Sequence, residues 1–197
     1  MAVSRNLNRL KELNLPGVYL FPCDITTVHM PELAEFVRTK LGTVDVLINN
    51  AGAILNKPFQ EITLEEMQYT YNVNVFSVAR IIQALLPIIY KDGHIVNISS
   101  MGGFMGSAKF AGLSMYSSSK GALCTLSECL AEEFKEIGVR VNALCLGAVQ
   151  TEMLSEAFPG YVAPVTPMDM ASYIANFALS AHHFINGKCV PVSLSTP

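Results

Sequence analysis

Short apolar runs alternate along the chain with longer segments whose apolar residues recur at helical spacing. The runs have the length of β-strands and lie at residues 18–21, 44–48, 94–98, 139–144 and 189–192. Between them, residues 31–41 have the periodicity of a helix, and Thr63 with Glu66 has the pattern of a helix-opening capping box. Apolar strands separated by crossover helices predict a Rossmann-type, doubly wound α/β fold with a parallel sheet covered on both faces. Since no repeat or linker divides the sequence, we expect a single domain over residues 1–197.

Small and polar residues follow four of these runs, where each predicted strand ends. They are Cys23-Asp24-Ile25, Asn49-Asn50-Ala51-Gly52, Ser99-Ser100, and Leu146-Gly147 leading to Thr151. In doubly wound sheets, ligands bind beyond the carboxyl ends of the strands. The sequence therefore predicts a ligand cleft at this edge of the sheet.

Tyr116 and Lys120 lie one helical turn apart and are the first candidates for chemistry in that cleft. An ammonium about 4 to 6 Å from a phenol favours the phenolate, which lowers the phenol pKa from about 10 toward a range useful for proton transfer. Tyr-x-x-x-Lys is common by chance, so its meaning depends on the residues around it. Ser100 ends a predicted strand and can donate to a substrate oxygen near the phenol, and Asn74 is a polar group inside an apolar helix.

The motifs Asn-Asn-Ala-Gly, Val-Asn-Val, Ile-Val-Asn-Ile-Ser-Ser and Tyr-Ser-x-Ser-Lys, in this order, resemble the short-chain dehydrogenase/reductase family over nearly the whole chain. The resemblance implies hydride transfer between a nicotinamide cofactor and a carbonyl/alcohol pair. It implies that Ser100 steadies the substrate oxygen and that Tyr116 transfers the proton. It also implies that Lys120 lowers the tyrosine pKa and holds the ribose, while Asn74 supports a water relay. Ser100 takes the role because the active serine of the family is usually the second of the pair, so Ser99 is expected to face the core.

The same resemblance implies the cofactor contacts. From adenine to nicotinamide they are Asp24 and Ile25, then Asn50, Ala51 and Gly52, then Tyr116 and Lys120, then Val149 and Thr151. Ser4-Arg5-Asn6 resembles the end of the second family strand, where an acid would bind the ribose 2′-hydroxyl of NAD and an arginine the 2′-phosphate of NADP. Arg5 therefore favours NADP over NAD. The alternative is a solvated arginine opening a helix that continues through Arg9 and Lys11.

The opening strand and the Thr-Gly-x-x-x-Gly-Ile-Gly turn of the family are absent, because Val3-Ser4-Arg5 already resembles the end of its second strand. In the family strand order 3-2-1-4-5-6-7, this absence leaves unmet backbone groups within the sheet. A start site placed too late, a truncated chain and a partner segment that fills the gap are three open explanations. Without glycine amides and a helix N-terminus for the pyrophosphate, cofactor affinity should fall. The alternative to an enzyme is a non-catalytic fragment, or a binding or oligomerisation module unable to hold the cofactor.

Two smaller departures lie on the substrate side. The interval from Ser100 to Tyr116 is longer than is usual in the family, and residues 101–115 are rich in Gly, Phe and Met. This stretch predicts a pliable apolar wall over a small apolar carbonyl or alcohol, or alternatively a plain surface loop. Leu146 replaces the usual proline before Gly147, which affects the expected path toward the nicotinamide contacts.

Composition argues against several other classes of protein. A net charge of −3 without a basic cluster argues against a nucleic-acid surface. The longest apolar stretch is too short for a membrane span and the N-terminus has no signal pattern, so we expect no membrane association and a cytoplasmic location.

The five cysteines and four histidines lack metal-ligand spacing, so we expect no metal and buried free thiols. Without a Gly-x-Ser-x-Gly elbow, a serine hydrolase is not expected. The family resemblance implies a homodimer or homotetramer.

Overall fold

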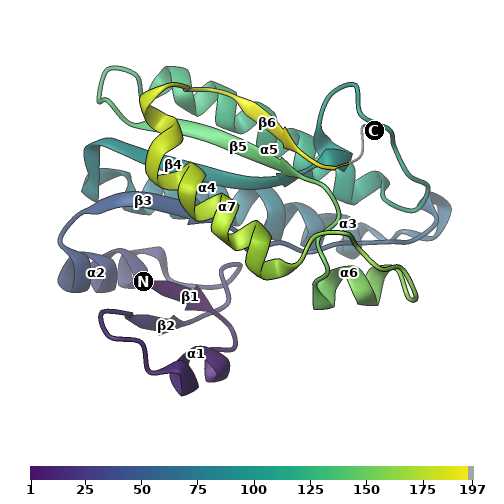
Figure 1. Ribbon diagram of the computed structural model, residues 1–197, viewed down its shortest axis with the longest axis horizontal. Coiled ribbons are helices and arrows are strands. Elements are labelled where there is room, and N and C mark those ends of the chain that lie inside the picture. Colours follow the sequence, from purple (N-terminus) through teal and green to yellow (C-terminus); the bar gives the residue numbers. More distant parts are fainter. Residues whose placement is uncertain (195–197) are drawn as a thin grey trace.

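The computed structural model describes residues 1–194, in which parallel strands alternate with helices (Figure 1). Two strands, β1 (Ala2–Ser4) and β2 (Leu20–Pro22), form one small parallel sheet. The other sheet has the order β3-β4-β5-β6 and is also parallel; its strands are β3 (Val44–Asn49), β4 (Ile89–Ser100), β5 (Arg140–Leu146) and β6 (Cys189–Val192). The predicted strands are therefore present, with β2, β4 and β5 shifted or extended at their ends.

Seven α-helices connect or flank these strands within the described residues. They are α1 (Asn8–Leu13), α2 (Met30–Leu41), α3 (Leu64–Tyr71), α4 (Ser77–Leu85), α5 (Ser114–Glu133), α6 (Glu152–Ala157) and α7 (Pro167–Ser180). Short 3-10 turns occur at Phe59–Glu61 (η1), Leu86–Ile88 (η3), Met101–Gly103 (η4) and Ala181–His183 (η5). One π-helical segment, η2 (Asn72–Phe76), joins α3 to α4.

Helices cover both faces of the larger sheet, which confirms the doubly wound prediction. On one face, α4 and α5 pack against Ile95 of β4 and Val141 of β5. On the other face, α7 crosses in front of the strands in Figure 1 and packs on Val96 of β4 and Leu144 of β5. All four of these strand residues are fully buried, because successive side chains of a central strand point to opposite, covered faces.

The sheet is interrupted between β1 and β3. The two sheets share a core that includes Phe21 of β2, Leu33 of α2 and Val44 of β3, yet no ladder joins β1 to β3 in residues 1–194. This break lies where the missing family strand was expected. The edge strand β3 leaves Ile48 40% exposed, in contrast to the central strands.

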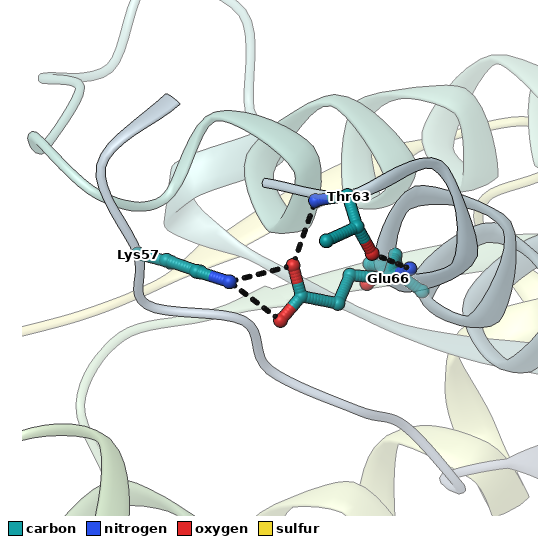
Figure 2. A network of polar contacts seen from close by, with 4 residues as sticks. Lys57, Thr63 and Glu66 are labelled. Carbon is teal, nitrogen blue, oxygen red and sulfur yellow. Dashed lines mark hydrogen bonds and ion pairs between the residues drawn. The ribbon is translucent and has the colours of Figure 1, made fainter. Parts of the chain in front are cut away.

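The predicted capping box of α3 is present and connects two segments near the cleft. Figure 2 shows the Glu66 carboxylate accepting from the Thr63 amide at 2.8 Å and from Lys57 Nζ at 3.0 Å, while Thr63 Oγ1 accepts from the Glu66 amide. The Lys57 amide in turn donates to Gly112 O at 3.0 Å. The loop after β3 is therefore held both to α3 and to the loop that precedes α5.

Two further sequence predictions concern thiols and membranes. Cys124 and Cys145 are buried, whereas Cys23 and Cys189 are half-buried. Cys129 is exposed, so the expectation that the thiols are buried is wrong at this position, which lies on the solvent side of α5. No helix in the described part of the chain is long and apolar enough to cross a membrane.

Candidate active site

Tyr116 lies in the first turn of α5, facing the end of β4. The Ser100 hydroxyl, at the last position of β4, lies close enough to the Tyr116 side chain to influence the pKa of the phenol. Burial raises the pKa of Tyr116 above its ordinary value, and the Ser100 hydroxyl opposes that rise. Ser99 points to the core instead: it is buried and its hydroxyl donates to Lys120 O at 2.9 Å. The structure therefore places Ser100, not Ser99, beside the phenol.

Lys120 is buried one turn beyond Tyr116, but its ammonium is engaged by the backbone. Lys120 Nζ donates to Ile98 O at 2.8 Å and lies 6.0 Å from the centre of the Tyr116 ring. Burial lowers the pKa of Lys120 to about 8. In this arrangement the Ile98 carbonyl binds the Lys120 ammonium, and burial is the largest influence on the pKa of Tyr116, so the lowering of that pKa by Lys120 stays a prediction.

Asn74 belongs to the π-helical segment η2 and lies buried between α5 and the loop after β3. Its Oδ1 accepts from the Ala53 amide at 2.8 Å, and its Nδ2 donates to Ala53 O and to Ser119 Oγ, each at 2.9 Å. A π-helical turn is wider than an α-helical turn and commonly marks a functional site. Both amide hydrogens of Asn74 are thus used to hold the loop and α5 in place.

Ser119 is a site residue that the sequence analysis did not identify. It is fully buried, accepts from Asn74 and donates to Tyr116 O at 2.7 Å. It therefore connects the amide of Asn74 to the backbone of the tyrosine. The only available signal was its position within Tyr-Ser-Ser-Ser-Lys, where three adjacent serines cannot be told apart without their partners.

Gly52 brings the loop after β3 directly against these residues. A Cβ at this position would lie 3.3 Å from both Asn74 Oδ1 and Lys120 Nζ, tighter than an ordinary contact. Gly52 therefore adjoins Lys120 and Asn74 just after the carboxyl end of β3, and the absence of a side chain on Gly52 permits the close approach.

The expected adenine contacts lie at the ends of β1 and β2. Asp24 Oδ1 accepts from the Thr26 hydroxyl at 2.7 Å and from its amide at 2.8 Å, and these bonds lower the pKa of the Asp24 carboxyl. Ile25 is half-buried against the core. Arg5 is exposed just after β1, close enough to favour the Asp24 carboxylate electrostatically. Arg5 precedes α1 by three residues and does not lie in a helix.

The expected nicotinamide contacts lie in the loop after β5. Val149 forms an isolated parallel bridge with Val165, and Thr151 is the N-cap of α6, where its Oγ1 accepts from the Leu154 amide at 3.2 Å. Leu146 remains within β5, and the Gly147 amide donates to Val192 O at 2.8 Å. The chain therefore stays paired with β6 as far as Gly147, and only then turns toward Val149 and Thr151.

The segment before α5 carries exposed apolar side chains. Met105 is 92% exposed and Phe110 is 61% exposed. The loop after β3 is also bonded to α6, since Asn56 Nδ2 donates to Ala157 O at 2.8 Å. No group of three or more His, Cys, Asp or Glu side chains within residues 1–194 is arranged to hold a metal ion.

Comparisons with known proteins place this geometry in a family. Residues 2–161 match the family model described as short chain dehydrogenase. The chain belongs to the short-chain dehydrogenase/reductase family. It is 36% identical to the short-chain dehydrogenase cctT of Talaromyces islandicus over 76% of this chain and 53% of that protein. It is 32% identical to the 7alpha-hydroxysteroid dehydrogenase of Escherichia coli (strain K12) over 87% of this chain and 71% of that protein. The chain therefore spans about half the length of the first relative and more of the second.

Solved structures of this family share the fold. A short-chain dehydrogenase/reductase from Brucella melitensis, described as glucose/ribitol dehydrogenase, superposes with a TM-score of 0.84 at 23% identity, covering 96% of this chain and 83% of that chain. A short chain dehydrogenase from Burkholderia cenocepacia in complex with NADP superposes with a TM-score of 0.77 at 26% identity, covering 88% and 74%. The Rossmann-type architecture predicted from the sequence is confirmed.

Proposed function

We propose that this chain is an NADP(H)-linked oxidoreductase that interconverts a small apolar carbonyl compound and its alcohol, with Tyr116 as the general acid/base. The observation that carries the proposal is the meeting of Tyr116 with Ser100 at the end of β4, beside the buried Lys120. These three side chains supply a proton, a hydrogen-bond donor and a positive charge at one edge of the sheet. That set suits a reaction in which charge develops on a carbonyl oxygen.

In the reducing direction, the substrate oxygen would lie against the Tyr116 and Ser100 hydroxyls. Ser100 donates a hydrogen bond to that oxygen, and Tyr116 transfers its proton to it as the alcohol forms. A raised phenol pKa keeps Tyr116 protonated at neutral pH, which is the form that an acid needs before reduction. A nicotinamide cofactor, when bound, would supply the hydride. In the oxidising direction, Tyr116 must first lose its proton, so the Lys120 charge matters most there.

The residues at the strand ends fit most of a dinucleotide. Asp24 and Ile25 would hold the adenine, residues 50–52 its ribose, and Tyr116 with Lys120 the nicotinamide ribose. Val149 and Thr151 would contact the carboxamide. The close packing of Gly52 on Lys120 and Asn74 supports this fit, because a side chain there would fill the space beside the lysine. The 197 residues contain no glycine-rich turn for the pyrophosphate, so the proposal assigns that group to no residue.

Arg5 supports NADP over NAD. Arg5 is an exposed cation at the end of β1, next to the turn that carries Asp24. The position therefore holds a base and not an acid. A guanidinium suits a 2′-phosphate, whereas the 2′-hydroxyl of NAD is usually held by an acid. The family relative from Burkholderia cenocepacia was solved with NADP.

The exposed apolar side chains before α5 support an apolar substrate. Met105 and Phe110 offer flexible and aromatic surface in the segment between Ser100 and Tyr116. We further propose that the protein acts in the cytoplasm as a homodimer or homotetramer. Light scattering on the eluted peak of a size-exclusion column would measure the oligomeric state directly.

The experiment has a binding arm and a turnover arm. NADPH and NADH are titrated separately, and NADPH oxidation is then followed with a panel of aliphatic and aromatic ketones. Tyr116→Phe should keep NADPH affinity within about 3-fold but lower turnover by about 10²–10⁴-fold, because only the transferable proton is removed. Tyr161→Phe, at a tyrosine that is 51% exposed, is the matched control and should retain turnover. Undiminished turnover in Tyr116→Phe would contradict the assignment.

A further inference from the structure

Three cysteines meet beneath Lys120, in a part of the core that the proposed reaction does not use. They come from three different elements: Cys124 from α5, Cys145 from β5 and Cys189 from β6. Cys124 Sγ and Cys145 Sγ are 3.5 Å apart, and Cys189 packs against the same core cluster. The chain thus gathers three thiols in one part of the core, two of them in direct contact, without a metal-binding arrangement among the described residues.

The cluster is bonded to polar groups of the active site and is not simply apolar filling. Cys124 Sγ donates to Ser99 Oγ at 3.2 Å, and Ser99 Oγ donates to Lys120 O. Cys124 also follows Lys120 by one helical turn, on the same side of α5. Hydrogen bonds from the Cys145 and Cys189 thiols, aided by the Lys120 ammonium, lower the pKa of Cys124. The Cys145 pKa is raised, chiefly by its bond to Cys124.

The three thiols differ in exposure. Cys145 is fully buried and Cys124 is 8% exposed, whereas Cys189 is half-buried on the last strand of the sheet. Cys189 packs against the buried pair from the edge strand β6 and is the more exposed neighbour of that pair.

We propose that Cys124 and Cys145 form an oxidation site that a hydroperoxide converts to a disulfide. The Cys124 sulfur attacks one peroxide oxygen, an S–O bond forms, the O–O bond breaks, and the leaving hydroxide takes the thiol proton as water. The Cys145 sulfur then attacks the resulting sulfenic acid, the S–S bond forms, the S–O bond breaks, and a second water leaves. Two thiols and one hydrogen peroxide thus yield one disulfide and two waters, and two electrons pass from sulfur to oxygen.

The disulfide would change the hydrogen bonds around the backbone of Lys120. A disulfide is about 2.05 Å long, so the two sulfurs must approach by about 1.5 Å. The new bond ties α5 to β5 and removes the Cys124 donor from Ser99. Ser99, which donates to the Lys120 carbonyl, then loses the donor that holds its hydroxyl in place. Turnover is therefore expected to fall as the disulfide forms and to return on reduction.

The first measurement needs no variant and no assumption about activity. The folded protein is treated with hydrogen peroxide, remaining thiols are blocked under denaturing conditions, and the peptides are mapped by mass spectrometry without reduction. A peptide pair joined through Cys124 and Cys145, lost on treatment with dithiothreitol, is the expected result. The proposal is overturned if both residues are blocked as free thiols after peroxide treatment, or if the disulfide joins Cys189 instead.

Two variants test the order of the steps. In Cys145→Ala the second step has no partner, so Cys124 should accumulate as a sulfenic acid that dimedone traps; a Cys124–Cys189 disulfide formed at the wild-type rate would refute the assignment of Cys145. Cys129→Ala removes an exposed thiol on the same helix and should leave the disulfide unchanged. If NADPH-linked turnover is measurable, it should decline at the rate of disulfide formation in wild-type protein. The disulfide map stands apart from the proposed function, so either can fail without the other.

Discussion

His94 makes the stability of this protein depend on pH in a way that its burial determines. The ring is fully buried in β4, where Nδ1 bonds Ala178 O at 2.8 Å and Nε2 bonds Asn142 Nδ2 at 3.0 Å. Since an amide nitrogen donates and a carbonyl accepts, the neutral ring must carry its proton on Nδ1. Protonation of Nε2 would place a second donor against the Asn142 amide. Burial, the largest cause, lowers the pKa of His94 to about 4.

The sign and size of the effect follow from this pKa. The unfolded chain binds the His94 proton near pH 6.5, while the folded protein resists it until about pH 4, so acidification favours unfolding between these values. The stability that folding gains from the neutral, buried His94 ring is fully present above about pH 6.5. Linkage gives a loss of about 2 kcal/mol at pH 5 and about 3 kcal/mol at pH 4. Asp24, whose carboxyl pKa is also lowered, adds its loss only at still lower pH.

Urea unfolding followed by far-UV circular dichroism at pH 7.5 and pH 5 measures this loss. His94→Gln, which cannot be charged, should lower stability at pH 7.5 but flatten its pH dependence between the two conditions. His183→Gln alters an exposed histidine near the same end of the sheet and should keep the wild-type dependence. If wild type loses less than about 0.5 kcal/mol, or if His94→Gln keeps the same slope, the reasoning from burial is wrong.

Three further substitutions test the geometry of the site. Ser119→Ala leaves one of the two amide hydrogens of the buried Asn74 without an acceptor, which should cost about 1–3 kcal/mol in urea unfolding and lower turnover more than NADPH affinity, with partial rescue by Ser119→Thr. Gly103→Ala would place a Cβ 2.5 Å from the backbone of Gly121 and should destabilise the folded protein by about 1–3 kcal/mol. Gly121→Ala is the matched control, because the nearest neighbour of its Cβ lies at 3.4 Å. Equal melting temperatures for the two variants would contradict the packing argument. Arg5→Ala should weaken NADPH binding by about 10–100-fold and leave NADH unchanged, whereas an equal effect on both cofactors would remove the case for a 2′-phosphate contact.

The sequence by itself determined the architecture and the place of the chemistry. Period and length of the apolar runs predict β2 to β6, and the capping pattern of Thr63 and Glu66 predicts the start of α3, because these signals depend on neighbours in the chain. The parallel sheet then brings strand-end residues such as Ser100 to one edge. Spacing along a helix likewise relates Tyr116 to Lys120.

Only the tertiary structure decided how those residues are used. Lys120 bonds Ile98 O and burial is the largest influence on the tyrosine pKa, which no local pattern indicates. Ser119 gains its role from Asn74, far away in the sequence. Cys124 and Cys145 become neighbours only because α5 packs on β5. The physical reason is the same in each case: a side chain's charge state and partners depend on contacts between distant elements, and those contacts exist only after the core has packed.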